Sequence, residues 1–201
     1  MYDSIADTRP AGLRRRSLPA GTELWRVDTV PTESWSWTGF ATPRHRFDSA
    51  AGAFRTRYAG TSLRGALRER YFASGRYIPD DHHHHVLVHL TTNRPFRVLD
   101  LRTEANLDAL GIDDRISTSH EPAVWRFGHR LADQARRWWP QLDGIVYRSR
   151  TTPTTSINVA FFAAVAFEIE ARPFVASGAD LDDLVLHDQF TIGFDYGAEP
   201  V

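Results

Sequence analysis

The shortness of its apolar segments is the feature that most constrains what this sequence can fold into. No apolar run approaches the roughly 20 residues that a membrane-spanning helix needs, and proline and glycine interrupt the pattern repeatedly. Segments that alternate like strands stand beside segments with a helical period. With 201 residues and 42% hydrophobic content, the chain can bury one sizeable core. The sequence therefore predicts a single α+β domain with strands in the majority.

The pattern assigns most segments to one type of element. Strand-like runs cover residues 24–27, 54–58, 86–90, 96–101 and 145–147. Helical runs cover residues 63–72, 103–110 and 122–139. Two apolar stretches are less distinct: 158–169 fits a strand, a short helix or both, and 181–196 suggests a final strand or two.

The beginning of the chain reads as a flexible N-terminal arm, residues 1–20, ahead of a domain that spans residues 21–201. The arm is polar and lacks the cationic and apolar segments of a secretion signal. Its run Arg14–Arg16 could contact a polyanion, but a solvated charge run is the favoured interpretation. We expect a cytoplasmic protein.

Composition excludes several kinds of chemistry. Cysteine is absent, which excludes disulfides and thiolate catalysis. All 24 basic residues are arginine, so no lysine can form a Schiff base, and anions must be bound by arginine, backbone N–H groups or helix N-termini. A formal net charge of −1 gives no general attraction to nucleic acid or to an anionic membrane, and we expect neither as a partner. The sequence leaves open whether the protein is a homo-oligomer.

The histidines do not define a metal site. His82–His85 are consecutive, and consecutive strand residues point to alternate faces, so an exposed loop that enters a strand is the favoured interpretation. Any of the scattered histidines could be a general base, although surface or core positions are more common for such residues; these are His45, His89, His120 and His129. The sequence contains no Walker loop, GxGxxG, GxSxG or HExxH motif.

One stretch, residues 46–69, combines the groups that can hold an anionic ligand with a ring. Arg46 offers a planar fork of donors for phosphate or carboxylate oxygens. Tyr58 offers an aromatic face, and Glu69 a carboxylate that can stabilise developing positive charge. We expect them on a loop, at a strand end and on a helix. Taken alone, Arg46 or Glu69 would more often be half of a surface ion pair, so the combination carries the prediction.

Together with later segments, this stretch resembles the RES domain family, named for its Arg, Glu and Ser. The family's order of motifs corresponds here to Arg46-Phe47, Gly52, Tyr58-Ala59-Gly60 and Ala66-Leu67-Arg68-Glu69. Downstream, residues 98–101 resemble the family's strand that ends in aspartate, 143–150 its Ser-bearing segment, and 158–162 its Asn-led strand. The resemblance covers about residues 22–195.

The resemblance implies a fold similar to that of ADP-ribosyltransferases, with a split, twisted β-core, flanking helices and a cleft for NAD. It implies a toxin-like enzyme that degrades NAD+ at the nicotinamide–ribose bond, by phosphorolysis to ADP-ribose 1″-phosphate or by hydrolysis. NAD+ is then the substrate and phosphate a co-substrate, with no separate cofactor and no metal. Because the family resembles the toxins of bacterial toxin–antitoxin pairs, we also expect a cognate antitoxin that covers the cleft.

The resemblance also assigns roles to individual residues. Arg46 and Glu69 are the expected catalytic residues. The expected substrate-binding residues are Tyr58 against the nicotinamide ring, Ser149 on a phosphate or the carboxamide, Trp25 at the cleft wall, and Asn158.

One position departs from the family pattern. Asp48 stands where the family commonly has Asn, and an acid there could weaken the positive field of Arg46 or hold its guanidinium in place. Two alternatives stay open: ADP-ribosyl transfer to a macromolecule through the same cleft, and an NAD- or nucleotide-binding module without turnover.

Overall fold

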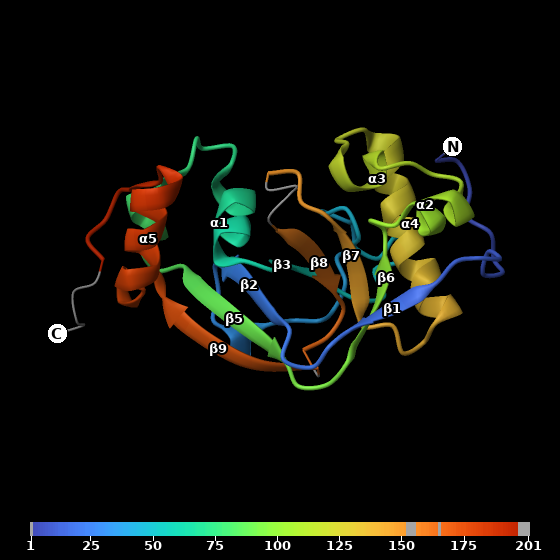
Figure 1. Cartoon of the computed structure of the whole chain (residues 1–201), viewed down its shortest axis with the longest axis horizontal. Coiled ribbons are helices and arrows are strands. Elements are labelled where there is room, and N and C mark those ends of the chain that lie inside the picture. Colours follow the sequence, from blue (N-terminus) through green and yellow to red (C-terminus); the bar gives the residue numbers. More distant parts are fainter. Residues whose placement is uncertain (1, 152–155, 165, 197–201) are drawn as a thin grey trace.

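The computed structural model describes residues 2–151, 156–164 and 166–196 (Figure 1). Met1 of the expected arm and residues 197–201 of the expected domain lie outside this part of the chain. Within it, eight strands form one curled sheet in the order β1-β6-β7-β8-β3-β2-β5-β9. These strands are Arg15–Leu18 (β1), Glu23–Asp28 (β2), Arg57–Gly60 (β3), Val86–Thr92 (β5), Phe96–Asp100 (β6), Gly144–Arg148 (β7), Ile157–Phe161 (β8) and Phe167–Pro173 (β9). β4 (Tyr77–Ile78) and β10 (Thr191–Ile192) form a separate parallel pair.

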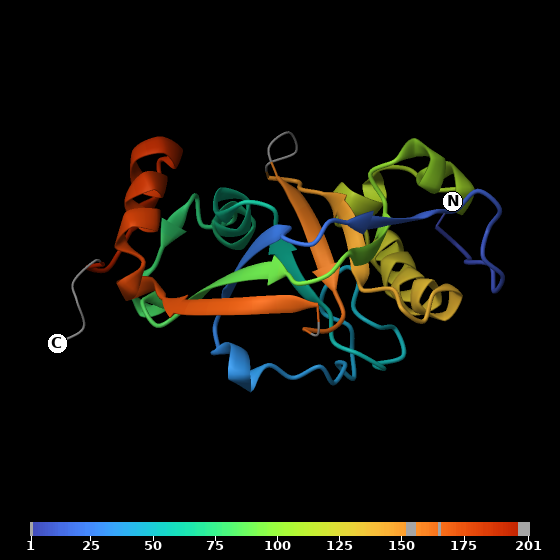
Figure 2. The same cartoon turned by 60° about the horizontal axis from the view of Figure 1, so that its bottom comes forward.

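The large sheet is almost divided between β2 and β3. These two strands share one register pair, Trp25 with Gly60. By contrast, β2 pairs with β5, and β3 with β8, along their whole lengths. Seen from the second direction, the strands on the two sides of the division are strongly inclined to each other (Figure 2). The division leaves a gap in the backbone pairing in the middle of the sheet.

Separate helices cover the two halves of the sheet. α2 (Glu104–Leu110), α3 (Arg115–Thr118) and α4 (Pro122–Trp138) lie beside the half that contains β6 and β7 (Figure 1). α1 (Leu63–Tyr71) and α5 (Gly178–Asp188) lie beside the half that contains β2 and β5. Two clusters of buried side chains follow this arrangement, one around Phe127 and Ile145 and one around Leu67 and Leu184. A third cluster, around Val88 and Phe161, joins strands of both halves. Short 3-10 turns occur at Thr32–Ser34, Asp80–His82 and Phe174–Ala176.

The three helices expected from the sequence, α1, α2 and α4, begin and end within one residue of the expected bounds. The hydroxyl of Ser62 accepts the backbone N–H of Gly65 at 3.0 Å and caps the start of α1. α4 has Pro122 in its first turn, and its buried residues recur at helical spacing. α2 ends at Gly111, whose φ of 64° lies in the left-handed region that glycine adopts readily.

The N-terminal stretch differs from the flexible arm that the sequence suggested. Residues 15–18 form β1, which pairs with β6 as an edge strand. Ahead of it, the ring of Tyr2 packs edge-on against Phe127 of α4, and its hydroxyl donates to Asp113 at 2.7 Å. Leu13 is also buried in the same cluster. Spaced apolar side chains, rather than a continuous apolar run, fix this stretch to the domain.

The C-terminal part also differs. Residues 178–188 form α5, where strands were expected, and only the two residues of β10 extend the strand content after it. Leu181 and Leu184, three residues apart, face the core, while Leu186 is 75% exposed. The ambiguous stretch 158–169 proves to hold most of β8 and the start of β9. In the part of the chain that the structure describes, none of the helices has the length and apolar character needed to cross a membrane.

Candidate active site

Glu69, on the last part of α1, lies where the two halves of the sheet meet. Four donors converge on its Oε1 atom: Ser149 Oγ at 2.7 Å, Asn158 Nδ2 at 3.1 Å, Thr151 Oγ1 at 3.2 Å and the backbone N–H of Arg150 at 3.3 Å. All four come from the end of β7 and from β8, about 80 to 90 residues further along the chain. The fold therefore holds one oxygen of this carboxylate with groups from a distant segment.

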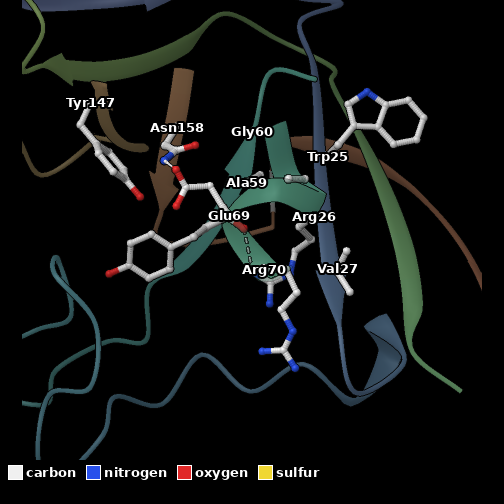
Figure 3. A pocket seen from close by; sticks show the side chains of 11 residues that line it. Trp25, Arg26, Val27, Ala59, Gly60, Glu69, Arg70, Tyr147 and Asn158 are labelled. Atoms are coloured by element: carbon white, nitrogen blue, oxygen red, sulfur yellow. Dashed lines mark hydrogen bonds between the residues drawn. The ribbon is translucent and has the colours of Figure 1, made fainter. Parts of the chain in front are cut away.

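The other carboxylate oxygen, Oε2, is left for the cleft. Among the described residues, no hydrogen-bond donor to Oε2 is found. Two cavities adjoin Glu69, and it lines both. Figure 3 shows Tyr147 and Asn158 directed toward the Glu69 carboxylate, with Arg26 and Arg70 on its other side in this view. Glu69 thus presents a negative charge at the centre of a mostly cationic cleft.

The two cavities form the lobes of one cleft because they share walls. The shared residues are Tyr58, Glu69, Tyr147 and Asn158. The Trp25 lobe, of about 180 Å³, is completed by Trp25, Arg26, Val27, Ala59, Gly60, Ala66 and Arg70. The Arg46 lobe, of about 250 Å³, is completed by His45, Arg46, Ser117, His120, Trp125 and Arg150. Each lobe therefore carries two arginines, and the Trp25 lobe lies over the division between β2 and β3.

Arg46 is a buried cation without a carboxylate partner in the described residues. Its guanidinium donates to the carbonyl oxygen of Ile116, within α3, at 2.9 Å and to that of Ser119, directly after α3, at 2.8 Å. The ring of Trp125 lies 5.5 Å from its charged carbon. Burial lowers the pKa of Arg46, although an arginine stays charged at neutral pH. The fork is therefore fixed in position, with its charge not neutralised by the protein.

Tyr58 connects the Arg46 loop to the cleft. Its hydroxyl accepts the backbone N–H of Phe47 at 2.8 Å and donates to Asp48 at 3.3 Å. Burial, followed by the charge of Asp48, raises its pKa well above the ordinary value. The hydroxyl is thus committed to the loop, and the ring is the part that lines both lobes.

Trp25 lies at the outer wall of its lobe. Its indole stacks on His89 of β5, with ring centroids 4.1 Å apart and an interplanar angle of 13°. It points over β5 and away from Glu69 in Figure 3. Trp25 therefore forms part of the wall of this lobe.

The structure brings the six expected residues together, but in two layers. Arg46, Glu69, Tyr58, Trp25 and Asn158 all line the cleft. Ser149 does not: it is fully buried, and its hydroxyl donates to Glu69 rather than into a cavity. Asn158 touches the cleft but uses its amide N–H on the same carboxylate oxygen.

Several cleft residues were not singled out from the sequence. Tyr147 lines both lobes, and burial followed by the charge of Glu69 raises its pKa, so its hydroxyl stays protonated. Arg150 lines the Arg46 lobe, and its charge lowers the pKa of His120 at the same wall. Tyr147 and Arg150 lie within two residues of Ser149, in the motif that carries the family resemblance, so their nearness to Ser149 was the available signal.

The consecutive histidines form a separate, partly buried group. His83 and His84 are exposed, as expected for a loop entering β5, whereas His85 is buried and its Nδ1 lies 3.1 Å from the hydroxyl of Tyr71. Among the residues described, no group of three or more His, Cys, Asp or Glu side chains is arranged to hold a metal ion.

The fold and the cleft together define a class: a single α+β domain with a split sheet and a carboxylate between two cationic lobes. Within that class, the chain belongs to the RES domain family, whose model matches residues 23–184. The family resemblance and the split α+β fold expected from the sequence are thereby confirmed.

A solved structure supports the same fold. The chain is similar to a chain of the M. tuberculosis MbcT–MbcA toxin–antitoxin complex, with a TM-score of 0.53 and 13% sequence identity. The match covers 78% of this chain and 86% of that chain. No curated protein matches the sequence.

Proposed function

We propose that this chain is a toxin-like enzyme that consumes NAD+ by breaking its nicotinamide–ribose bond, with phosphate as the acceptor. The observation that carries the proposal is the Glu69 carboxylate, held on one oxygen and flanked by two arginine-bearing lobes. Membership of the RES domain family supports it. So does the structural likeness to a chain of a toxin–antitoxin complex.

Glu69 has the right chemistry for the bond that breaks. When the bond between the ribose anomeric carbon and the nicotinamide nitrogen opens, both electrons leave with the nitrogen and nicotinamide becomes neutral. Positive charge then develops on the ribose carbon and its ring oxygen. A preorganised carboxylate beside this carbon stabilises that charge. An oxygen of phosphate next bonds to the carbon and gives ADP-ribose 1″-phosphate; water in its place gives ADP-ribose and a proton.

The two lobes suit the other parts of the reaction. Arg46 and Arg150 offer guanidinium donors to the diphosphate or to the attacking phosphate. In the Trp25 lobe, Ala59, Gly60 and Ala66 leave room beside the ring of Tyr58, where the nicotinamide ring can pack. In this arrangement the scissile bond lies across the shared wall, next to Glu69.

A toxin of this kind needs a partner that keeps it inactive. We propose that a cognate antitoxin covers the cleft and places acidic groups against the exposed donors of both lobes. Arg26 of the Trp25 lobe pairs with Asp28, but Arg70 in that lobe and Arg46 and Arg150 in the other have no carboxylate partner among the described residues, which favours an acidic occupant.

Product analysis tests the proposed reaction. The purified protein is incubated with NAD+, with and without phosphate, and the products are identified by mass spectrometry. We expect nicotinamide and ADP-ribose 1″-phosphate in a reaction that depends on phosphate. Phosphate-independent formation of ADP-ribose would mean hydrolysis, and ADP-ribose on a macromolecule would mean transfer. A stable stoichiometric complex with intact NAD+ would mean a binding module.

Two variants test the assigned roles. Glu69→Gln and Arg46→Ala should each lower turnover by a factor on the order of 100 or more, because each removes a charge that acts on the transition state. Glu69→Gln should keep the fold, since its amide oxygen can accept the same four donors. Circular dichroism and thermal unfolding control for folding. Turnover like that of the wild type in both folded variants would remove these roles.

A further inference from the structure

We infer that Thr151, together with Ser149 and Asn158, is a positioning residue that orients Glu69 so that only Oε2 meets the substrate. This inference rests on the proposed NAD-cleaving function and refines the same site. It assigns a role to Thr151, and it moves Ser149 and Asn158 from binding the substrate to holding the carboxylate.

The first argument is the saturation of Oε1. A carboxylate has two oxygens with about four acceptor sites in total. Three side-chain donors and one backbone N–H already lie within 3.3 Å of Oε1. No acceptor capacity remains there for a ribose hydroxyl or for the charge that develops on the anomeric carbon. Because Glu69 lines both lobes and its Oε2 accepts no hydrogen bond from the described residues, Oε2 is the atom left for that task.

The second argument is that Ser149 cannot face a ligand. It is fully buried, its hydroxyl proton is donated to Glu69 at 2.7 Å, and its oxygen accepts the backbone N–H of Thr151 at 3.3 Å. Thr151 lies 3.4 Å from the Ser149 hydroxyl and donates its own to Glu69. Both hydroxyl protons are thus donated to the carboxylate, and the backbone N–H of Thr151 holds the Ser149 oxygen in place.

The third argument concerns orientation. The terminal torsion of a glutamate is broad, so the carboxylate plane is not fixed by rotamer preference. Donors from β8 and from the end of β7 approach the same oxygen, and this fixes the plane. A charge that is held in place before the reaction stabilises the transition state without reorganisation. Loss of one donor should thus lower kcat and leave substrate binding nearly unchanged.

Thr151→Val tests the inference because valine keeps the shape of threonine and removes only the hydroxyl. We expect kcat to fall by on the order of 10-fold, the equivalent of one hydrogen bond to a charged group. KM should stay within about two-fold of the wild type, since no substrate contact is lost. Thr151→Ser, which restores a hydroxyl, should recover most of the rate. Thr191→Val, at an exposed position of β10, is the matched control.

Each failure has its own signature. An active wild type with an unchanged kcat in Thr151→Val would overturn the inference, and a raised KM with an unchanged kcat would mean that Thr151 touches the substrate. If the wild type does not consume NAD+, the proposed function fails. The inference is then tested by a crystal structure of the valine variant. Disorder of the Glu69 carboxylate supports it, and an unchanged carboxylate refutes it.

Discussion

Arg46 and Asp48 are two residues apart and carry opposite charges, yet they do not pair. Asp48 is almost fully buried, and its Oδ2 accepts the backbone N–H groups of Arg44 at 2.9 Å and His45 at 2.8 Å. Its Oδ1 faces the hydroxyl of Tyr58. Asp48 therefore closes the turn that presents Arg46 and makes no contact with the guanidinium. The aspartate that replaces the family's common Asn therefore stabilises the loop. It does not hold the Arg46 guanidinium by direct contact, and it does not weaken the charge of Arg46 by pairing with it.

Substitution of Asp48 separates loop closure from charge. Asp48→Asn keeps an oxygen for the two backbone N–H groups, so the fold and the turnover should stay close to those of the wild type. Asp48→Ala leaves buried donors unpaired and should lower the free energy of unfolding by about 1–3 kcal/mol. Urea unfolding and NAD+ consumption measure the two effects. A large loss of turnover in a stable Asn variant would mean that the charge itself is needed.

Some residues of this cleft could be predicted from the sequence and others could not. Arg46, Tyr58 and Glu69 could be found because they fall in one short stretch with a recognisable order. For Tyr147 the only signal was its nearness to Ser149 in the chain, because a tyrosine within a buried strand has the same pattern whether or not it borders a cavity. Ser149 lies behind Glu69 instead of in the cleft because its hydroxyl donates to that residue, 80 positions earlier in the chain. Spacing along the chain carries no information on that contact.

At the scale of elements, α1 is held in place by contacts from two different parts of the chain. Glu69 is held from β7 and β8, and the preceding turn is held by α5. Asp188, at the end of α5, is almost fully buried and pairs with Arg64 and Arg68 of α1. Arg76 also donates to the carbonyl oxygen of Asp188 at 2.9 Å. The C-terminal helix thus supports the helix that carries the central carboxylate.

Asp188→Asn tests this connection. The variant loses the negative charge between two arginines that remain partly exposed, so the free energy of unfolding should fall by about 1–3 kcal/mol. Hydrogen exchange should rise first in α5 and in the N-terminal turn of α1. Asp183→Asn, at an exposed position on α5, is the matched control. Equal exchange in the two variants would contradict a supporting role for Asp188.

The same contact shows why α5 was not predicted. Read locally, the stretch around Leu184 to Leu186 has the run of apolar residues typical of a strand. It becomes a helix because two leucines fit the core beside α1 and because Asp188 meets two arginines there. Both reasons are tertiary, and they override a weak local preference. The longer, regular α4 needed no such help, and the sequence predicted it within one residue at its end.

At the scale of the whole molecule, stability should depend on pH through His85. Burial, with nearby positive charge from His82 and Arg70, lowers the pKa of His85 from 6.5 to about 4. In the unfolded chain His85 takes up a proton below about pH 6.5. The folded chain resists this uptake until about pH 4. The contribution of His85 to the free energy of unfolding should therefore be constant above about pH 6.5 and should fall as the pH drops toward about 4.

His85→Asn removes the titrating group and keeps a polar neighbour for Tyr71. The difference in unfolding free energy between about pH 7 and about pH 5, measured with urea, should be smaller in this variant than in the wild type. His187→Asn, on the exposed face of α5, controls for the loss of a histidine. The same pH difference in His85→Asn and in the wild type would show that other groups dominate the dependence.

The long-range hold on Glu69 has a consequence for the chain while it is being made. Asn158 follows Glu69 by 89 residues, and a ribosome adds about 5–20 residues per second. The central carboxylate therefore leaves the ribosome roughly 5 to 20 seconds before the donors that orient it. During this interval the nascent polypeptide has no assembled site, so the activity proposed above would arise only near the end of its synthesis. A ribosome that stops before β8 would release an inactive product.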